Sequence, residues 1–341
     1  MNPVDSEVKA RASAAMAVME GVDGSWSLED LEQLEGGWSR HSWTLGLRDA
    51  TGARREFIVR VKPPGGMLAT SIEQEFRIYS LLQDEPIPTP AVHGLESNPD
   101  NAFGGPFFVM DKAPGRSPNA WRRQDREANE ANWRDGGSVA RDLVSHLAHI
   151  HSIGFERVQQ LVEPRDFQAN LAHWQAVYER ARLVRDPIIE EAYAWVAQRE
   201  PEPQPPCLVH GDYRPGNCLI QDGRLSAILD WELSFFGDPR FDLGYLSLEY
   251  TAGKMAAPGS PLLAAVADHD WFYAEYERLS GRAVDRDVVR TFSVMSALML
   301  ISILTTGLRM YADGHSTDAR MVWLRFAIPG LRQDITKLMN W

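Results

Sequence analysis

Three polar residues close together in the chain could hold a metal ion and take a proton from an alcohol. They are Asp212, Asn217 and Asp230, in the segment VHGDYRPGNCLIQDGRLSAILDWE, residues 209–232. The runs NCLI and LSAILDW predict two strands that turn at QDGR, because Asp-Gly favours a tight hairpin turn. Such a hairpin would bring Asn217 beside Asp230 and leave Asp212 on the loop before it. Taken singly, these residues are also ordinary turn formers.

The chemistry that suits this group is phosphoryl transfer. Amide and carboxylate oxygens are hard ligands of the kind that Mg²⁺ takes, so we expect Asn217 and Asp230 to bind Mg²⁺. Asp212 would orient an alcohol and accept its proton. The kinase catalytic loop H-R-D-x-x-x-x-N has the same spacing as HGDYRPGN, which runs from His210 to Asn217. We expect His210 to fix the loop rather than to act as a base.

The HGD motif, the LDW segment and GDPRFDLGYL at residues 237–246 resemble the aminoglycoside phosphotransferase-like family of small-molecule kinases. The resemblance implies an α+β, two-lobed protein-kinase-like fold, with a small antiparallel sheet in the N-terminal lobe and a mostly helical C-terminal lobe. It implies transfer of the γ-phosphate of ATP, or alternatively of GTP, to a hydroxyl of a small molecule, with Mg²⁺ as cofactor and Asp212 as the catalytic residue. In this family Asp242 would brace the catalytic loop.

The N-terminal third of the chain carries further matches to this family. GGWSRHSW resembles the nucleotide loop, and FIVR has an arginine where kinases usually carry the lysine that pairs with phosphate. Lys62 lies on the same face of the strand as Arg60 and is the competing candidate. MDKA resembles the hinge whose backbone meets the adenine edge. The nucleotide-binding residues that the resemblance implies are Gly36, Gly37, Ser39, Arg60, Lys62, Glu75, the gatekeeper Met110, Asp111 and Ala113.

The acceptor of the phosphate is less clearly indicated. The Pro-Pro-Gly after FIVRVK and the NLAHWQAVYERAR segment resemble a subgroup related to the kinase domain that is fused to acyl-CoA dehydrogenases. That subgroup implies a hydroxyacyl-CoA-type substrate, whereas the acidic composition slightly favours an aminoglycoside-like one. The helices that cover the acceptor vary within the family, so the fold does not name the substrate.

The elements that must position these residues fall into two expected lobes. Residues 1–110 are predicted to form a helix and a nucleotide-binding sheet, because the runs SWTLGLR and REFIVRVK are separated by turns. SIEQEFRIYSLLQDE has helical periodicity, and Glu75 lies close to its apolar stripe, where a carboxylate needs a partner. Residues 111–118 are the expected hinge. Residues 119–341 are the expected helical lobe, with the catalytic loop at 209–232 and acceptor-covering helices at 166–200.

Composition limits the classes of partner that the protein is expected to bind. The formal net charge of −12 argues against a nucleic-acid partner. Cys207 and Cys218 are too few for a disulfide framework, which indicates a reducing, cytoplasmic compartment. The apolar segment 292–308 is short for a membrane span and is expected to be a buried core helix, so no membrane partner is expected. The oligomeric state has no signal in the sequence.

Two other functions compete with a kinase. The chain could be a pseudokinase that binds nucleotide without transferring phosphate, although Asp212, Asn217 and Asp230 are all present. It could also be a metal-dependent phosphohydrolase that uses the same acids. The three residues in register, together with the matches in the N-terminal third, favour the kinase.

Overall fold

The chain folds into two compact units, Met1–Pro114 and Gly115–Trp341. The structure is a computed structural model, and it describes residues 3–34, 39–254 and 259–341. The division lies within residues 111–118, the segment expected to be the hinge. Each unit has its own buried core.

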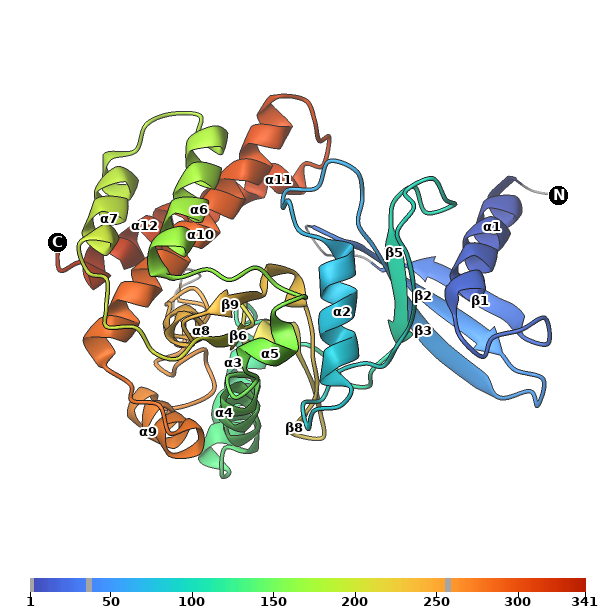
Figure 1. Ribbon diagram of the computed structural model, residues 1–341, viewed down its shortest axis with the longest axis horizontal. Helices are drawn as coiled ribbons and strands as arrows, with labels where there is room; N and C mark the ends of the chain where they lie inside the picture. Colours follow the sequence, from blue (N-terminus) through green and yellow to red (C-terminus); the bar gives the residue numbers. More distant parts are fainter. Residues whose placement is uncertain (1–2, 35–38, 255–258) are drawn as a thin grey trace. The chain divides into compact units, whose positions relative to one another are not determined.

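Unit 1 is built on an antiparallel five-stranded sheet (Figure 1). The strand order is β1-β2-β3-β5-β4, and every neighbouring pair is antiparallel. This confirms the small antiparallel sheet predicted for the N-terminal lobe. Its strands are β1 (Ser27–Gln33), β2 (His41–Arg48), β3 (Arg54–Val61), β4 (Val92–Glu96) and β5 (Phe107–Asp111).

Two helices cover opposite faces of this sheet, α1 (Pro3–Val18) and α2 (Ile72–Leu82) (Figure 1). Successive side chains of a strand point to opposite faces, so β5 contributes to both. Phe107 and Val109 join the core that includes Ala12 and Ala15 of α1. Phe108 contacts the α2 face, where its ring centroid is 5.8 Å from that of Tyr79.

Unit 2 is mostly helical, and its longest helix, α10, packs against α6, α7, α8 and α12. Within the described part of the chain, α10 alone is long and apolar enough to cross a bilayer, and 83% of its most apolar window is buried in the structure. The predicted core helix at 292–308 lies inside it. The α-helices of unit 2 are α3 (Arg123–Arg134), α4 (Ser138–Ile150), α5 (Phe155–Val158), α6 (Phe167–Ala181), α7 (Pro187–Ala197), α8 (Arg240–Leu246), α9 (His269–Ser280), α10 (Arg286–Ala312), α11 (Arg320–Trp323) and α12 (Ala327–Leu338).

Among the described residues of unit 2, the β-strands form two short antiparallel pairs. The predicted hairpin is present, with Cys218 opposite Ile228 and Asp222-Gly223 at the turn. Both turn residues have positive φ, 49° and 75°, as a two-residue hairpin turn of type I′ requires. The strands and 3₁₀ turns of this region are β6 (Cys207–Val209), η1 (Pro215–Asn217), β7 (Cys218–Gln221), β8 (Arg224–Ile228), η2 (Trp231–Leu233) and β9 (Phe235–Gly237), and a third 3₁₀ turn, η3 (Leu324–Phe326), precedes α12.

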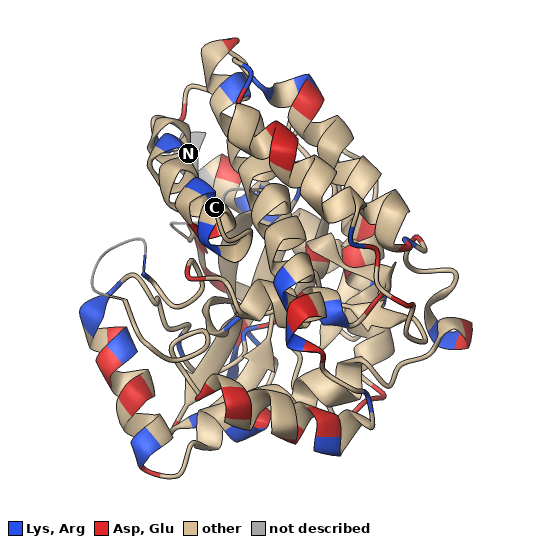
Figure 2. Ribbon diagram, turned by 90° about the vertical axis from the view of Figure 1, so that its left-hand side faces the viewer, with Lys and Arg blue, Asp and Glu red and all other residues tan. Residues whose placement is uncertain are grey.

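Charged residues of both signs alternate along the helices rather than forming long stretches of one sign (Figure 2). In α3, Arg123 and Glu127 form an i,i+4 ion pair of 2.7 Å. Although α3 is rich in polar residues, its Asp125, Arg126 and Asn129 are buried, so its polarity does not mark an exposed segment.

Candidate active site

The loop that follows β6 depends on a glycine at its centre. Gly211 has φ +85°, in the region that favours glycine, and a Cβ placed there would lie 2.5 Å from the carbonyl oxygen of Leu233. The chain therefore turns between His210 and Asp212 in a way that a larger residue would disturb. This close approach explains why the middle residue of the HGD motif is a glycine.

A buried carboxylate holds the same loop from behind. Asp242, in α8, accepts hydrogen bonds from the backbone amides of His210 and Gly211, each at 2.8 Å. Its exposed fraction is 0%. Hydrogen bonds from two backbone amides satisfy a buried carboxylate and fix the backbone that donates them. The expected bracing role of Asp242 is confirmed by these contacts.

His151 completes the surroundings of Asp242. Its Nε2 donates to Asp242 Oδ2 at 3.1 Å, so its Nδ1 accepts from the Tyr276 hydroxyl at 2.7 Å. Burial lowers the pKa of His151, and the Asp242 carboxylate opposes that shift only in part. A neutral ring with one defined tautomer therefore lies behind the loop.

His210 is also committed to structure. Its Nε2 donates to the Leu229 carbonyl at 3.0 Å, and its Nδ1 accepts from the Asp212 amide at 3.2 Å. The ring is fully buried and its centroid lies 4.4 Å from that of Trp231. Because both ring nitrogens are hydrogen-bonded to backbone groups of the loop and hairpin, His210 fixes the conformation of the loop, as expected from the sequence.

Asp212 is held by side chains on one side. Arg214 Nε lies 3.1 Å from Asp212 Oδ1, and the Tyr245 hydroxyl also hydrogen-bonds the Asp212 carboxylate. Desolvation alone would lower the pKa of the Arg214 guanidinium, but the Asp212 carboxylate, Tyr245 and Tyr250 together raise it. The Asp212 side chain is 17% exposed. It is thus an oriented carboxylate that can still be reached.

Asn217 links the loop to the hairpin. Its Nδ2 donates to the Asp212 carbonyl at 2.9 Å, and its own carbonyl accepts from the Leu229 amide at 2.8 Å. The residue after Leu229 is Asp230, a non-glycine residue with φ +70°. The backbone of Asn217 is therefore hydrogen-bonded to Leu229, the residue just before Asp230. This pairing agrees with the predicted hairpin.

The donor set of these two residues suits Mg²⁺. With Nδ2 committed to the loop, the amide oxygen Oδ1 of Asn217 remains as an acceptor, and Asp230 adds a carboxylate. Across residues 3–34, 39–254 and 259–341, no cluster of three or more His, Cys, Asp or Glu residues could hold a metal ion. A metal bound here would rely on few protein ligands, which is usual for Mg²⁺.

In unit 1, the contacts of Glu75 show which of the two candidate cations, Arg60 or Lys62, faces α2. Arg60 Nε is 2.6 Å from Glu75 Oε1. The Lys62 ammonium instead donates to the carbonyl of Thr70. Glu75 is fully buried, as its position near the apolar stripe predicted. Of the two candidates from the sequence, Arg60 is the one that pairs with the helix carboxylate.

The other predicted nucleotide residues lie in two places. Met110 is buried in β5, opposite Ile58 of β3. The Asp111 carboxylate lies 2.8 Å from His93 Nε2, so its side chain is occupied within unit 1. Ala113 is half-buried in the segment after β5, and Ser39 is buried just before β2. Gly36 and Gly37 lie outside the described residues.

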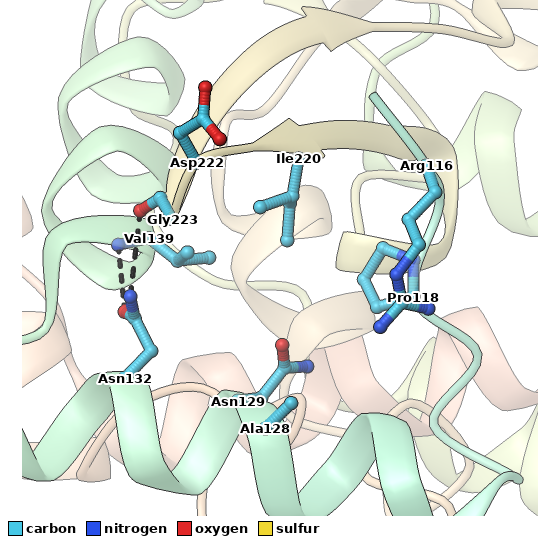
Figure 3. Close-up of a pocket in the computed structure, with 9 residues that line it drawn as sticks. All are labelled: Arg116, Pro118, Ala128, Asn129, Asn132, Val139, Ile220, Asp222 and Gly223. Carbon is cyan, nitrogen blue, oxygen red and sulfur yellow. Dashed lines mark hydrogen bonds between the residues drawn. The ribbon is translucent and has the colours of Figure 1, made fainter. Parts of the chain in front are cut away.

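A hollow of ≈ 260 Å³ lies beside the turn of the hairpin (Figure 3). The Asn129 side chain points into it from α3, and Asn132 is bonded to the Val139 amide at 3.0 Å. The residues that line it do not include the polar groups of the loop, so it is separate from the candidate site. They are Arg116, Pro118, Ala128, Asn129, Asn132, Val139, Ile220, Asp222 and Gly223.

Four side chains at these two sites were not predicted from the sequence. Arg214 lies within HGDYRPGN, and its place two residues after Asp212 could have drawn attention to it. Arg40, whose Nε lies 3.3 Å from Glu75 Oε2, belongs to GGWSRHSW, and Tyr245 belongs to GDPRFDLGYL, but neither segment indicates the partner of these residues. His151 has no comparable signal, because its partner is distant in the chain. His151 and Asp242, for example, are 91 residues apart.

Comparison with known families gives one match over most of the chain. The sequence profile of the phosphotransferase enzyme family, APH, matches residues 30–282. Among curated proteins, mouse acyl-CoA dehydrogenase family member 10 is 29% identical over 282 residues, covering 79% of this chain and 24% of that protein. The chain spans about a quarter of the length of that relative. The expected resemblance to a subgroup linked with acyl-CoA dehydrogenases is confirmed.

Solved structures share the fold. A protein from Ralstonia eutropha, provisionally assigned as an aminoglycoside phosphotransferase, aligns with a TM-score of 0.73 at 21% identity, covering 97% of this chain and 98% of that one. A thermostable mutant of aminoglycoside phosphotransferase APH(4)-Ia, in a ternary complex with AMP-PNP and hygromycin B, aligns with a TM-score of 0.58 at 16% identity. That alignment covers 90% of this chain and 94% of the other. The predicted fold class is confirmed.

Proposed function

The chain belongs to the APH phosphotransferase enzyme family, and from this premise we propose that it is an ATP- and Mg²⁺-dependent kinase that phosphorylates a hydroxyl of a small molecule. The observation that carries the proposal is the loop from His210 to Asn217. It presents an oriented carboxylate, Asp212, in a backbone fixed by Asp242. It joins this carboxylate to a hairpin that supplies an amide and a second carboxylate.

Asp212 is the residue proposed to act on the acceptor. The hydroxyl oxygen of the acceptor forms a bond to the γ-phosphorus, and the bond from that phosphorus to the β,γ-bridging oxygen breaks. The hydroxyl proton goes to Asp212, and ADP leaves. Such proton transfer contributes roughly 10²–10⁴ in rate.

Arg214 and Tyr245 are proposed to hold Asp212 ready for this step. Both donate to the carboxylate, so its rotamer is set before the substrate binds. Burial raises the pKa of Tyr245 well above its usual range, which keeps its hydroxyl protonated as a donor. Fixing a reacting group beforehand avoids an entropic cost during the reaction.

Asn217 and Asp230 would hold Mg²⁺. A bound Mg²⁺ would neutralise charge on the phosphate oxygens. Arg60 is proposed to pair with the nucleotide phosphates, since arginine can contact phosphate with two parallel hydrogen bonds. The backbone of Asp111 and Ala113 is proposed to meet the base, with ATP preferred and GTP as the alternative.

We propose an acyl-CoA-type acceptor that carries a hydroxyl group. The support comes from the mouse relative, which covers 79% of this chain and is named as an acyl-CoA dehydrogenase family member. An aminoglycoside is the competing acceptor, because the APH(4)-Ia structure that shares the fold contains hygromycin B.

The test is an ATP-consumption screen with Mg²⁺ across hydroxyacyl-CoAs, aminoglycosides, macrolides, amino alcohols and sugars. ADP release with one acceptor, and loss of at least about a hundredfold in kcat for Asp212→Asn with ATP binding retained, are the expected results. Asp222→Asn, in the hairpin turn, is the matched control and should keep its activity. Normal turnover by Asp212→Asn would reject the mechanism. Phosphatase activity without any nucleotide would reject the kinase itself.

A further inference from the structure

The hollow beside the hairpin turn lies entirely within unit 2 (Figure 3). It is formed by residues 116–118, one side of α3, the start of α4 and the turn between β7 and β8. Its volume of ≈ 260 Å³ exceeds that of a cavity of roughly 150 Å³ that admits a benzene ring. The hollow is therefore large enough for a small cyclic ligand.

Hydrogen bonds join the segments that form the walls of the hollow. Arg116 and Ile220 exchange two backbone hydrogen bonds, of 3.1 and 2.9 Å. Asn132 of α3 donates through its carboxamide to the Ser138 hydroxyl at 2.9 Å, and that hydroxyl donates to the Gly223 carbonyl at 2.7 Å. The hairpin is thus tied both to the chain before α3 and to the start of α4, so the hollow has a defined shape.

Asn129 presents a buried carboxamide to this hollow. Its exposed fraction is 6%, and its side chain points into the hollow from α3 (Figure 3). Among the residues that the structure describes, none forms a hydrogen bond with this side chain. Burial of a polar group without a hydrogen bond is unfavourable. The carboxamide therefore indicates a ligand that forms hydrogen bonds with it.

The other lining residues limit the chemistry of that ligand. Arg116 is paired with Asp125 at 2.7 Å, so its charge is balanced within the protein. The Asp222 carboxylate points away from Asn129 (Figure 3) and would disfavour an anion. The apolar lining side chains, which would contact a ring, are those of Pro118, Ala128, Val139 and Ile220.

We propose that this hollow binds a neutral planar ring that carries a carboxamide or lactam group. A carboxamide has a donor and an acceptor side by side, so two amides can pair through two hydrogen bonds. The ligand donates to Asn129 Oδ1 and accepts from Nδ2, and its ring lies against the apolar side chains. The site is separate from the candidate active site, and its assignment does not rest on the proposed function.

The test is a ligand-observed NMR titration of the full chain with nicotinamide, a ring that carries a carboxamide. We expect saturable binding with a Kd on the order of 1 mM. Nicotinate has the same ring, but its carboxylate cannot donate, so it should bind at least about tenfold more weakly. Asn129→Leu should also weaken nicotinamide binding at least about tenfold. Gln124→Leu removes an exposed carboxamide of α3 that does not line the hollow, and it should bind as wild type does.

Thermal unfolding distinguishes a ligand site from a structural role of Asn129. Replacing an unpartnered buried amide by an apolar side chain of similar size removes a desolvation penalty, so Asn129→Leu should unfold at the wild-type temperature or above it. A clearly lower unfolding temperature would show that the carboxamide serves the fold and would overturn the inference. Equal nicotinamide binding by wild type and Asn129→Leu, or none by wild type, would also overturn it. Asn129→Ala, which cannot overfill the hollow, should lose binding as well and keeps the test decisive if the leucine variant does not fold.

Discussion

Glu75 in unit 1 and Asp242 in unit 2 are both fully buried carboxylates, but they are compensated in different ways. Two guanidinium groups, from Arg40 and Arg60, surround Glu75. Asp242 is surrounded by two backbone amides and a neutral imidazole, that of His151. The first arrangement gathers positive charge, and the second fixes the path of the backbone.

The difference indicates what each carboxylate is for. A carboxylate satisfied by backbone amides holds a loop in one shape and leaves little positive charge nearby for a ligand. A carboxylate paired with two arginines instead joins segments that are distant in the chain, because Arg40 lies just before β2, Arg60 lies in β3 and Glu75 lies in α2. The same residue type therefore fixes a loop in unit 2 and links the sheet to a helix in unit 1. The following substitutions test this contrast.

The largest effect is expected for Glu75→Gln. It leaves Arg40, which is buried, and Arg60, which is partly exposed, without their shared carboxylate, and breaking a buried ion pair on one side costs about 3–5 kcal/mol. Urea denaturation followed by circular dichroism would measure the loss. The double variant Arg40→Gln, Glu75→Gln should be more stable than Glu75→Gln, because one unmatched charge is gone. Additive losses in the double variant would contradict the shared pairing.

A smaller loss of stability, about 2–3 kcal/mol, is expected for Asp242→Asn. The asparagine side chain keeps one acceptor oxygen, but its NH₂ group would face a donor, the backbone amide of either His210 or Gly211. The loop should shift, so kcat should fall more than KM rises. Steady-state kinetics and denaturation of the same preparation would check both effects. A variant with full activity would show that Asp242 does not fix the loop.

Substitutions of Arg60, in β3, and of Lys62, just after β3, should affect nucleotide binding to different extents. Arg60→Ala should raise the KM for ATP about tenfold, or about 1.4 kcal/mol, because Arg60 is the partner of Glu75. Lys62→Ala should raise it by no more than about threefold, since Lys62 is bound to the Thr70 carbonyl. Initial rates at varied ATP concentration would decide. The reverse order would move the phosphate site to Lys62.

A third buried carboxylate, that of Asp334, accepts a hydrogen bond from one backbone amide where Asp242 accepts from two, and the effect of replacing it should be the smallest. Burial and the nearby Glu249 raise the pKa of Asp334 to about 6, although the Glu249 amide donates to it and Lys337 and Lys254 oppose the shift. The folded state then holds the proton more tightly than the unfolded state, so this group lowers stability as the pH rises from about 4 to about 6.

Asp334→Asn should therefore be more stable than wild type by about 1 kcal/mol at pH 8 and show no gain near pH 4. Thermal unfolding across this pH range would measure the difference. Asp313→Asn, whose carboxylate is partly exposed and paired with Arg309, is the control and should show no such trend. A gain that does not depend on pH would exclude ionisation of Asp334 as its cause.

The contrast between the two units also explains which features could be predicted from the sequence. The loop and hairpin of unit 2 are built by residues close in the chain, so the spacing of Asp212 and Asn217 and the Asp-Gly turn predicted them. The helical period also predicted that Glu75 faces inward. It gave no signal for Arg40, which lies 35 residues away and belongs to no periodic pattern. Partners that meet only through tertiary packing, such as His151 and Asp242, need the structure.

The fixed tautomers of His151 and His210 make the loop observable in solution. Each ring carries its proton on Nε2, where it is buried and hydrogen-bonded, to Asp242 in one case and to the Leu229 carbonyl in the other. Such protons exchange slowly with water and give separate downfield signals in a proton NMR spectrum. One signal reports on the back of the loop and the other on its junction with the hairpin, without any added label.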